Sequence, residues 1–460
     1  MLVKTRFCPS PTGLMHLGNA RTALFSALAA KTNGVFLLRI EDTDLERSEL
    51  RYTQALKEDL QWLGCQWQEG PGCEVPEHGS YEQSQRLAIY QYYYDVLIQK
   101  GMAYFCYCTP EELDASRKRQ ARMGKPPRYT GTCKHLKQVP EGKAATLRFA
   151  MPEGETIEFE DIVRGHQRFH TDDIGDFIIR KADGMPTFMF CNAIDDSLMG
   201  VNLALRGEDH LTNTPRQLLI LKALGLPAPQ YGHISLILGE DGAPLSKRNG
   251  SRSIRELREQ GYLPLAVVNY LARLGHVYTG HNQLMSFEDC AHYFSLDHLV
   301  KAPARYDQHQ LQHWQKEAVM SLTDEEYLEW LQYTDLSLVP MHKKASFLSI
   351  IRSNILFSQE VSDWAARLFS PVSELSDEHR AVLQEAGESF LPTVAMILQA
   401  VNTYADLCAA IKEKLGLSGK KLFMPLRVLI SQQTHGPELA ALFDLVGKEV
   451  LIQRCESYGI

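Results

Sequence analysis

The first forty residues combine two short apolar runs with one helical pattern. Residues 2–7 are β-prone, and the PSPTG that follows (9–13) ends the strand, because proline lacks an amide donor and glycine favours a turn. From about 16 to 31, apolar residues recur on one face at helical spacing. They are Leu17, Ala20, Leu24, Ala27 and Leu28.

Asn33-Gly34 favours the end of this helix, and VFLLRI (35–40) has the pattern of a buried strand. The order strand, loop, helix, strand predicts a βαβ unit of a parallel sheet.

Further along, residues 146–163 alternate as strands do, and 211–225 predict an amphipathic helix. In that helix we expect Thr214 to cap, Pro215 to occupy the first turn and Gln217 to complete a capping box. The chain turns helical from about 251, residues 306–460 are almost entirely helical in pattern, and 369–380 resembles a linker between two bundles.

Composition narrows the class of protein. A chain of 460 residues suggests about two to four domains, and 44% hydrophobic with 23% charged residues is typical of a soluble globular protein. The amino terminus lacks the apolar core of a signal peptide, and no apolar run reaches the ~20 residues that span a bilayer. We therefore expect no membrane contact. Ten unevenly spaced cysteines favour a reducing cytosol, so we expect a cytoplasmic protein.

The net charge of −8 argues against nonspecific coating of nucleic acid but allows a specific RNA to dock on a local basic patch. Segment 117–143 is such a patch, with Glu141 as its single acid. Its cations are Arg117, Lys118, Arg119, Arg122, Lys125, Arg128, Lys134, Lys137 and Lys143. Charge alone leaves two readings open, a solvated face and an RNA-binding face.

Two loops have the composition of phosphate sites. The first delivers Ser10, Thr12, Gly13, His16 and Gly18 to a helix amino terminus, where exposed amides and the helix dipole favour phosphate. The second is GAPLSKRNG (242–250), which places Lys247 and Arg248 on a loop that is unlikely to pack. For each loop an interpretation without a ligand also stays open. The first would be a strand-to-helix turn with a surface histidine, and the second a solvated surface loop.

The two loops together resemble class I aminoacyl-tRNA synthetases. PSPTGLMHLGNARTAL (9–24) resembles their HIGH-type signature in the form of glutamyl enzymes, with His16-Leu17-Gly18-Asn19 as its core, and RIEDTD (39–44) also matches. Leu245-Ser246-Lys247-Arg248 resembles their KMSKS-type loop. Pro244 departs from the motif, because it stands where the first lysine normally is and removes one cation.

The resemblance implies site residues. It implies that the catalytic residues are His16, Gly18, Lys247 and Arg248. ATP would contact Ser10, Thr12, Gly13, His16, Gly18, Asn19, His210, Leu245, Ser246 and Lys247, although a structural role for His210 is equally open. Glutamate would be held by Arg6, Ser10, Glu41, Asn192 and Arg206. Phe188 stands where relatives usually have tyrosine, so the hydroxyl contact of that tyrosine is not carried over.

A zinc site is predicted from Cys106, Cys108, Cys133 and His135, because two short cysteine and histidine pairs with 24 residues between them can close a tetrahedral site. The spacing also resembles a zinc-containing subset of bacterial glutamyl enzymes. Such a site is structural and would brace the basic segment near the tRNA acceptor end. The alternative is reduced cysteines that are merely close in sequence.

The expected fold is α/β, a Rossmann-like parallel sheet with a zinc-bearing α+β insertion and all-α anticodon-binding domains. The expected ranges are 1–100 and 175–250 for the split catalytic domain, 101–174 for the insertion, 251–305 for a stem-contact region, and 306–370 and 381–460 for two helical subdomains.

The leading hypothesis is a monomeric glutamate–tRNA ligase that uses ATP, Mg²⁺, L-glutamate and tRNA(Glu), with one structural Zn²⁺. Two alternatives stay open: preferential or relaxed glutamylation of tRNA(Gln), as by a divergent second copy, and a tRNA-binding paralogue with weakened catalysis.

Overall fold

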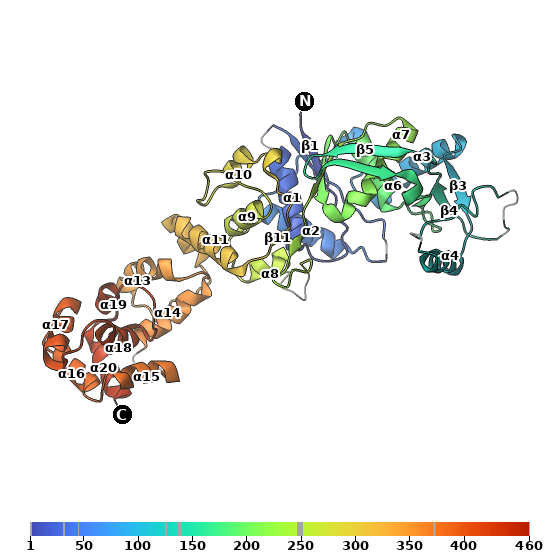
Figure 1. Ribbon diagram of the computed structural model, residues 1–460. Coiled ribbons are helices and arrows are strands. Elements are labelled where there is room, and N and C mark those ends of the chain that lie inside the picture. The colour runs from blue at the N-terminus through green and yellow to red at the C-terminus, as the bar shows by residue number, and fades with distance from the viewer. Residues whose placement is uncertain are drawn as a thin grey trace. The chain divides into compact units, whose positions relative to one another are not determined.

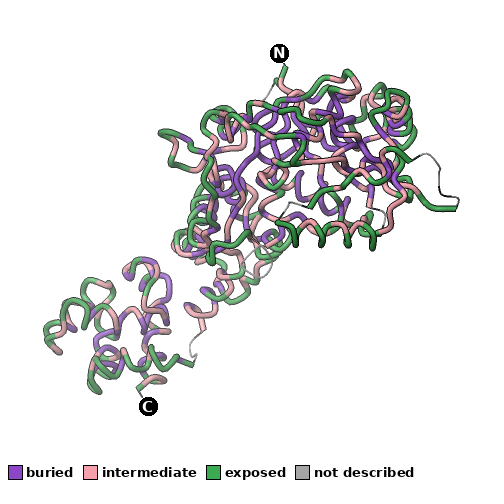
Figure 2. Tube along the Cα trace, turned by 45° about the vertical axis from the view of Figure 1, so that its right-hand side comes forward, coloured by how far each residue is buried: buried purple, intermediate pink, exposed green. Residues whose placement is uncertain are grey.

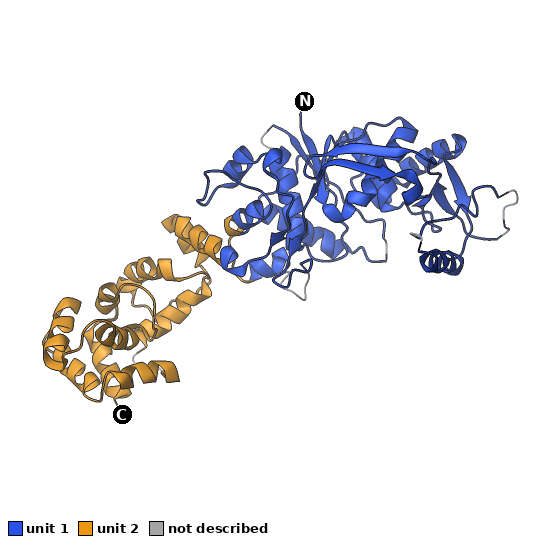
Figure 3. Ribbon diagram, viewed as in Figure 1, with its two compact units in different colours: residues 1–259, 267–311 blue, residues 260–266, 312–460 orange. Residues whose placement is uncertain are grey.

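The structure is a computed structural model that describes residues 2–30, 33–44, 46–124, 127–136, 140, 142–245, 252–370 and 374–459. The chain forms two compact units, shown in Figure 3. The first comprises residues 1–259 and 267–311, and the second residues 260–266 and 312–460. Among the described residues, every helix is too short or too polar to cross a membrane.

A mixed sheet forms the centre of the first unit (Figure 1), and in the described residues its strand order is β2-β1-β8-β9-β5-β6. The first five strands run parallel, and β6 pairs antiparallel with β5. The strands are β1 (Lys4–Phe7), β2 (Val35–Leu38), β5 (Thr156–Asp161), β6 (Gly165–His170), β8 (Leu203–Gly207) and β9 (Gln230–Ile234).

The predicted βαβ unit is confirmed. Helix α1 (Leu17–Ala30) connects β1 to β2, which pair in parallel from Lys4 with Val35 to Phe7 with Leu38. The five apolar residues predicted on one face of α1 are all buried. Arg21 and Ser26 are buried as well, because α1 is covered on most of its circumference.

Segment 101–174 contributes to two sheets. A small antiparallel sheet of order β3-β4-β7 contains β3 (Ala103–Cys106), β4 (Thr146–Phe149) and β7 (Phe177–Arg180). The strands β5 and β6 instead join the central sheet as a hairpin. The alternation predicted over 146–163 is confirmed by β4 and β5.

The remaining elements of the first unit surround these sheets. They are α2 (Leu50–Trp62), α3 (Leu87–Gln99), α4 (Pro110–Arg122), α5 (Thr171–Ile174), α6 (Phe188–Leu198), α7 (Thr214–Leu224), α8 (Ile254–Glu259), α10 (Phe287–Tyr293), β10 (Ile237–Leu238) and β11 (Ala304–Arg305). Helix α9 (Pro264–Arg273) falls where a helix was predicted.

The helix over 211–225 is confirmed, but its predicted cap is wrong. Helix α7 begins at Thr214, with Asn213 at the N-cap position and no capping bond from that side chain. The Thr214 hydroxyl bonds Arg206 and His233 instead, so it is not available to the helix. Both polar atoms of the buried Gln217 side chain lack a partner among the described residues, so no capping box forms.

The second unit is helical, as predicted for 306–460. Its described helices are α11 (Gln308–Ser321), α12 (Asp324–Trp330), α13 (Lys344–Ile351), α14 (Gln359–Phe369), α15 (Asp377–Glu385), α16 (Phe390–Leu398), α17 (Tyr404–Leu415), α18 (Lys420–Ser431), α19 (Leu439–Val446) and α20 (Lys448–Tyr458). One hydrophobic core runs from Val319 to Cys455, so helices before and after 369–380 pack together. Figure 2 shows buried segments in the interior of each unit.

Candidate active site and metal centre

The loop after β1 leads directly into helix α1. The first helical bond runs from the Ala20 amide to the His16 carbonyl at 2.9 Å, so the amides of residues 17–19 belong to the unpaired amino-terminal turn. A Cβ placed on Gly13 or on Gly18 would meet no atom within 4 Å. Backbone donors and open room at a helix amino terminus fit a phosphate group.

The second loop lies partly outside the described residues, since Ser246, Lys247 and Arg248 are not among them. Backbone hydrogen bonds hold both of its flanks. On one side, the Leu245 amide bonds the Ile237 carbonyl at 2.8 Å. On the other, the Ile254 amide bonds the Met15 carbonyl at 2.9 Å, and Ser253 forms a β-bridge with His16. The chain therefore leaves this loop directly beside the His16 loop.

Three of the residues expected to hold glutamate belong to one buried polar network. Arg6 contacts the Asp196 carboxylate at 3.2 Å, and the other oxygen of Asp196 accepts from Arg39 at 2.7 Å. Arg39 also donates to the side-chain oxygen of Asn192 at 2.9 Å. The Asn192 amide nitrogen is thereby turned toward Glu41, to which it donates at 3.3 Å.

Charge balance in this network is set by burial and by the guanidinium groups. Burial opposes ionisation of Asp196, but Arg6 and Arg39 outweigh it and lower its pKa. For Glu41 burial wins and raises the pKa to about 7, although Asn192, Arg39, Arg6 and Ser10 oppose the shift. Glu41 thus gains from a cationic partner, which a substrate ammonium would supply.

Arg206 occupies a separate buried position at the end of β8. Its Nε donates to His233 Nε2 at 3.0 Å, and one terminal nitrogen donates to the Thr214 hydroxyl at 2.8 Å. The other terminal nitrogen is buried and finds no partner among the described residues. The guanidinium also lies over the Tyr231 ring, 4.8 Å from its centre, and the buried Tyr231 hydroxyl likewise lacks a described partner.

The unpaired nitrogen of Arg206 suits a ligand that brings an oxygen acceptor, because an unpaired buried donor is costly. Burial lowers the pKa of Arg206 to about 10, so the group still carries its charge at neutral pH. Arg6 on β1 and Arg206 on the neighbouring β8 are thus two buried cations, which is the number that a dicarboxylate ligand would need in the proposed glutamate pocket.

Sequence reasoning missed the residues behind this pocket. Asp195 accepts from Arg86 at 2.8 Å, from Gln83 at 2.8 Å and from Tyr90 at 2.7 Å. The available signal was a charged residue inside an apolar run. Arg39 follows VFLL, and the two aspartates lie in FMFCNAIDD, where an unpaired charge would be too costly to bury.

Phe188 begins helix α6 and is half buried, and its ring stacks on His210 at a centroid distance of 5.0 Å. His210 lies in a short turn between β8 and α7 and has its Nδ1 3.2 Å from the Asn213 amide nitrogen. Burial lowers the pKa of His210, which favours its neutral form. The remaining residues proposed for ATP, namely Ser10, Thr12 and Asn19, are exposed at the same end of β1 and α1.

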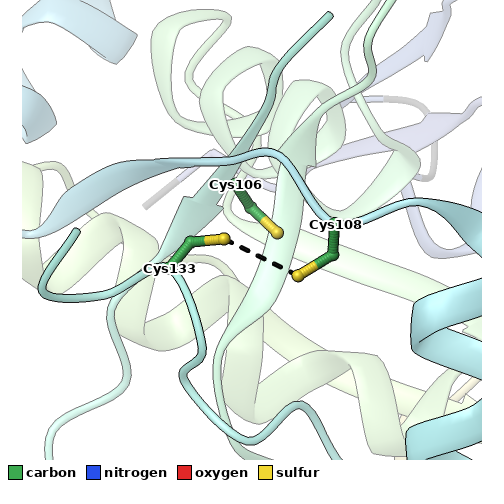
Figure 4. Close-up of side chains that lie close together, drawn as sticks. All are labelled: Cys106, Cys108 and Cys133. Atoms are coloured by element: carbon green, nitrogen blue, oxygen red, sulfur yellow. Dashed lines mark hydrogen bonds between the residues drawn. The ribbon is translucent and has the colours of Figure 1, made fainter. Parts of the chain in front are cut away.

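The sulfur atoms of Cys106, Cys108 and Cys133 meet in the insertion, as Figure 4 shows, and lie within 4.8 Å of one another. The Cys108 and Cys133 sulfurs are 3.6 Å apart, which is too far for a disulfide. His135 is exposed and lies outside this group. The Tyr129 hydroxyl is 3.4 Å from the Cys106 sulfur and 3.6 Å from the Cys108 sulfur.

The donor set fits zinc. Burial opposes ionisation of Cys106, but hydrogen bonding to Arg148 and Tyr129 lowers its pKa to about 7, toward the thiolate that binds metal. Arg148 also lies over the Tyr129 ring, 3.7 Å from its centre. Three cysteine sulfurs match the ligand type of a structural zinc site, and the Tyr129 oxygen lies beside two of them.

Basic residues surround this cysteine cluster. Helix α4 buries none of its side chains, and Arg117, Lys118, Arg119 and Arg122 are exposed on it. A cavity of 1680 Å³ lies between α4 and the cysteine segment, and Arg128, Lys134 and Arg216 are among its lining. Lys125, Lys137 and Glu141 lie outside the described residues.

Two family models match the chain. Residues 2–313 match the catalytic domain of the class I tRNA synthetases (E and Q), and residues 309–458 match an anticodon binding domain. Among curated proteins, Glutamate--tRNA ligase 1 of Methylococcus capsulatus is 52% identical over 99% of this chain and 98% of its own length. Glutamate--tRNA ligase 2 of Alkalilimnicola ehrlichii is 51% identical over 98% and 96%.

Solved structures agree with this similarity. A glutamate tRNA ligase from Elizabethkingia meningosepticum, crystallised in complex with its amino acid, superposes with a TM-score of 0.85 at 28% identity, covering 100% of this chain and 99% of that one. The predicted α/β fold with a helical anticodon-binding end is therefore confirmed.

Proposed function

Because the chain belongs to the class I tRNA synthetases for glutamate and glutamine, we propose that it is a glutamate–tRNA ligase acting on tRNA(Glu). The observation that carries the proposal is the pairing of the His16 loop with the flanks of the lysine loop, together with two buried arginines and a buried carboxylate expected to hold glutamate. The near full-length similarity to glutamate–tRNA ligases supports the same substrate.

The first step is activation of glutamate. A carboxylate oxygen of glutamate attacks the α-phosphorus of ATP, the bond to the bridging oxygen breaks, and pyrophosphate leaves as glutamyl-adenylate forms. The amides at the start of α1 and the His16 side chain hold phosphate oxygens. Lys247 and Arg248 follow the charge onto pyrophosphate, so that positioning and electrostatics lower the barrier without a protein nucleophile. Mg²⁺ bound with ATP would neutralise further phosphate charge.

The second step transfers the glutamyl group to RNA. A hydroxyl of the terminal adenosine attacks the activated carbonyl carbon, and AMP leaves. Arg206 and Arg6 are suited to the two carboxylates of glutamate before activation and to the one that stays free in glutamyl-adenylate, because guanidinium groups bind carboxylates through charge-assisted bonds. Glu41, supported by Asn192 and Ser10, is suited to the ammonium group.

A structural zinc ion fits the insertion. We assign Cys106, Cys108 and Cys133 as three ligands, and two residues compete for the fourth position. His135 is the candidate from the sequence, and Tyr129 is the one whose oxygen lies beside the sulfurs. Zinc would supply a closed structural site and no chemistry. Metal analysis of purified protein is expected to find one zinc per chain, and less than stoichiometric zinc would contradict the assignment.

The exposed cations of α4 and the cavity beside it are suited to the acceptor end of tRNA, since phosphate contacts dominate such docking. The helical unit would read the anticodon end, in keeping with the family that it matches. A monomer acting in the cytoplasm completes the proposal.

Charging of tRNA(Glu) and tRNA(Gln) side by side tests the proposal. We expect glutamylation of tRNA(Glu) and no comparable charging of tRNA(Gln). Equal charging of both would favour a relaxed enzyme, and failure on both would contradict the proposal. Pyrophosphate exchange that requires glutamate, ATP and tRNA would separate an enzyme from a tRNA-binding paralogue.

A further inference from the structure

A buried chain of hydrogen bonds ends on Arg206. Asp161, the last residue of β5, lies 2.5 Å from His233 Nδ1 through one carboxylate oxygen. The opposite ring nitrogen, Nε2, accepts from Arg206 at 3.0 Å. All three side chains are at least nine-tenths buried, with Asp161 and Arg206 3% and 4% exposed and His233 fully covered.

The proton on His233 has one suitable position in this chain. A carboxylate can only accept and Arg206 can only donate, so Nδ1 must carry the proton and Nε2 must be unprotonated. The Thr214 hydroxyl fits the same scheme. Its oxygen accepts from Arg206 at 2.8 Å, and its hydrogen can be donated to the unprotonated Nε2 of His233, 3.1 Å away. Burial lowers the pKa of His233 and so favours the neutral ring.

Asp161 also fixes the turn of the β5–β6 hairpin. Its other carboxylate oxygen accepts from the backbone amides of Val163 at 3.0 Å, Arg164 at 2.8 Å and His233 at 3.2 Å. Arg164 in turn forms an ion pair with Glu208, directly after β8. The hairpin turn is thus bonded to the ends of both β8 and β9, which border the pocket.

We propose that Asp161 and His233 are positioning residues for glutamate, which hold the guanidinium of Arg206 so that its remaining terminal nitrogen faces a substrate carboxylate. The inference deepens the proposed function and rests on it. Neither residue touches the substrate. His233 accepts from Nε of Arg206 and Thr214 accepts from one terminal nitrogen, which leaves the other terminal nitrogen, without a described partner, for the ligand.

Asp161→Asn is a sharp test, because it changes the proton position rather than the shape. The three backbone amides hold an oxygen at one position, so the new NH₂ group takes the other and faces Nδ1. Nδ1 must then accept, and the proton moves to Nε2, where it opposes the N–H of Arg206. We expect the KM for glutamate to rise at least about tenfold, with kcat at saturating glutamate and the KM for ATP changed less than about threefold.

The readouts are aminoacylation kinetics and the ¹⁵N spectrum of histidine-labelled protein, with His233 assigned by the signals lost in His233→Gln. We expect the proton on Nδ1 in the unmodified protein and on Nε2 in Asp161→Asn. Glu160→Gln is the matched control, since this exposed neighbour on β5 pairs with His166 away from the pocket. It should keep both the kinetics and the His233 signals of the unmodified protein.

Thr214→Val provides an independent variant if Asp161→Asn fails to fold. It removes the second acceptor of Arg206 and should raise the KM for glutamate while the proton stays on Nδ1. A proton on Nε2 of the unmodified protein would overturn the inference, as would an unchanged KM for glutamate in folded Asp161→Asn or, failing that variant, in Thr214→Val. An unmodified protein that charges no tRNA with glutamate would instead defeat the proposed function, while the ¹⁵N result would still report on the hydrogen-bond chain.

Discussion

Gly18→Ala should make the protein more stable and a poorer enzyme. Gly18 is the second residue of α1, and a Cβ there meets no atom within 4 Å, so alanine fits the helix without a clash. Alanine loses less backbone entropy than glycine on folding, which is worth about 0.5–1 kcal/mol in a helix. We therefore expect the free energy of unfolding to rise by up to about 1 kcal/mol.

The same methyl group occupies the room through which phosphate would approach the first-turn amides. Loss of one hydrogen bond to a charged group costs about 1.5–3 kcal/mol, which is roughly 10- to 150-fold in kcat/KM for ATP. Pyrophosphate exchange with tRNA present measures the kinetic loss, and thermal or denaturant unfolding measures the stability. A stable variant that keeps the ATP kinetics of the unmodified protein would refute the phosphate assignment of this loop.

Gly34→Ala is a contrasting control. Its Cβ would lie 2.1 Å from the Ala30 carbonyl oxygen and 2.5 Å from that of Val3, so backbone would have to move. We expect this variant to lose stability. The opposite signs of the two glycine variants separate a glycine kept for a ligand from a glycine kept for packing.

Three further outcomes are expected. Lys247→Ala, in the segment outside the described residues, should lower the rate of glutamate activation at least about tenfold, or about 1.4 kcal/mol, in pyrophosphate exchange, and an unchanged rate would remove it from catalysis. The KM for glutamate should rise as pH falls below about 7, because protonated Glu41 loses the charge that faces the substrate ammonium. Glu41→Gln should abolish that pH dependence and leave the KM high throughout. Tyr129→Phe should lose zinc to a chelator faster than His135→Ala does, and the reverse order would make His135 the fourth ligand.

The elements that sequence predicts well are those whose signals are local. The PSPTG sequence predicts the loop between β1 and α1, and apolar residues three and four positions apart predict the buried face of α1. The two loops that we propose to bind phosphate are recognised in the same way, because each carries its polar and basic residues within a short stretch. That the two loops lie side by side cannot be inferred from the residues alone. It is expected only because of the resemblance to class I synthetases. The structure shows this proximity through the bond between Ile254 and Met15.

The buried network of Arg6, Arg39 and Asp196 could not be predicted from the spacing of these residues in the sequence. Arg39 and Asp196 are separated by 157 positions, and Arg6 and Asp196 by 190. Only the fold, which places β1, β2 and α6 together, makes these charges neutralise one another. Sequence could have flagged each as a buried charge in need of a partner, but not which partner it finds.

The failed cap at Thr214 shows where local rules stop holding. Threonine, proline and glutamine stand at the spacing of a helix start, and the helix does begin there. Yet the hydroxyl that would cap α7 holds Arg206 and faces His233, so the first turn gives up a capping bond worth about 1 kcal/mol. Positions that break a local rule are often functional. Here a buried hydroxyl bonds the charged Arg206 of β8 instead of capping its own helix. By that criterion we assign Thr214 to the proposed glutamate pocket rather than to the helix that it begins.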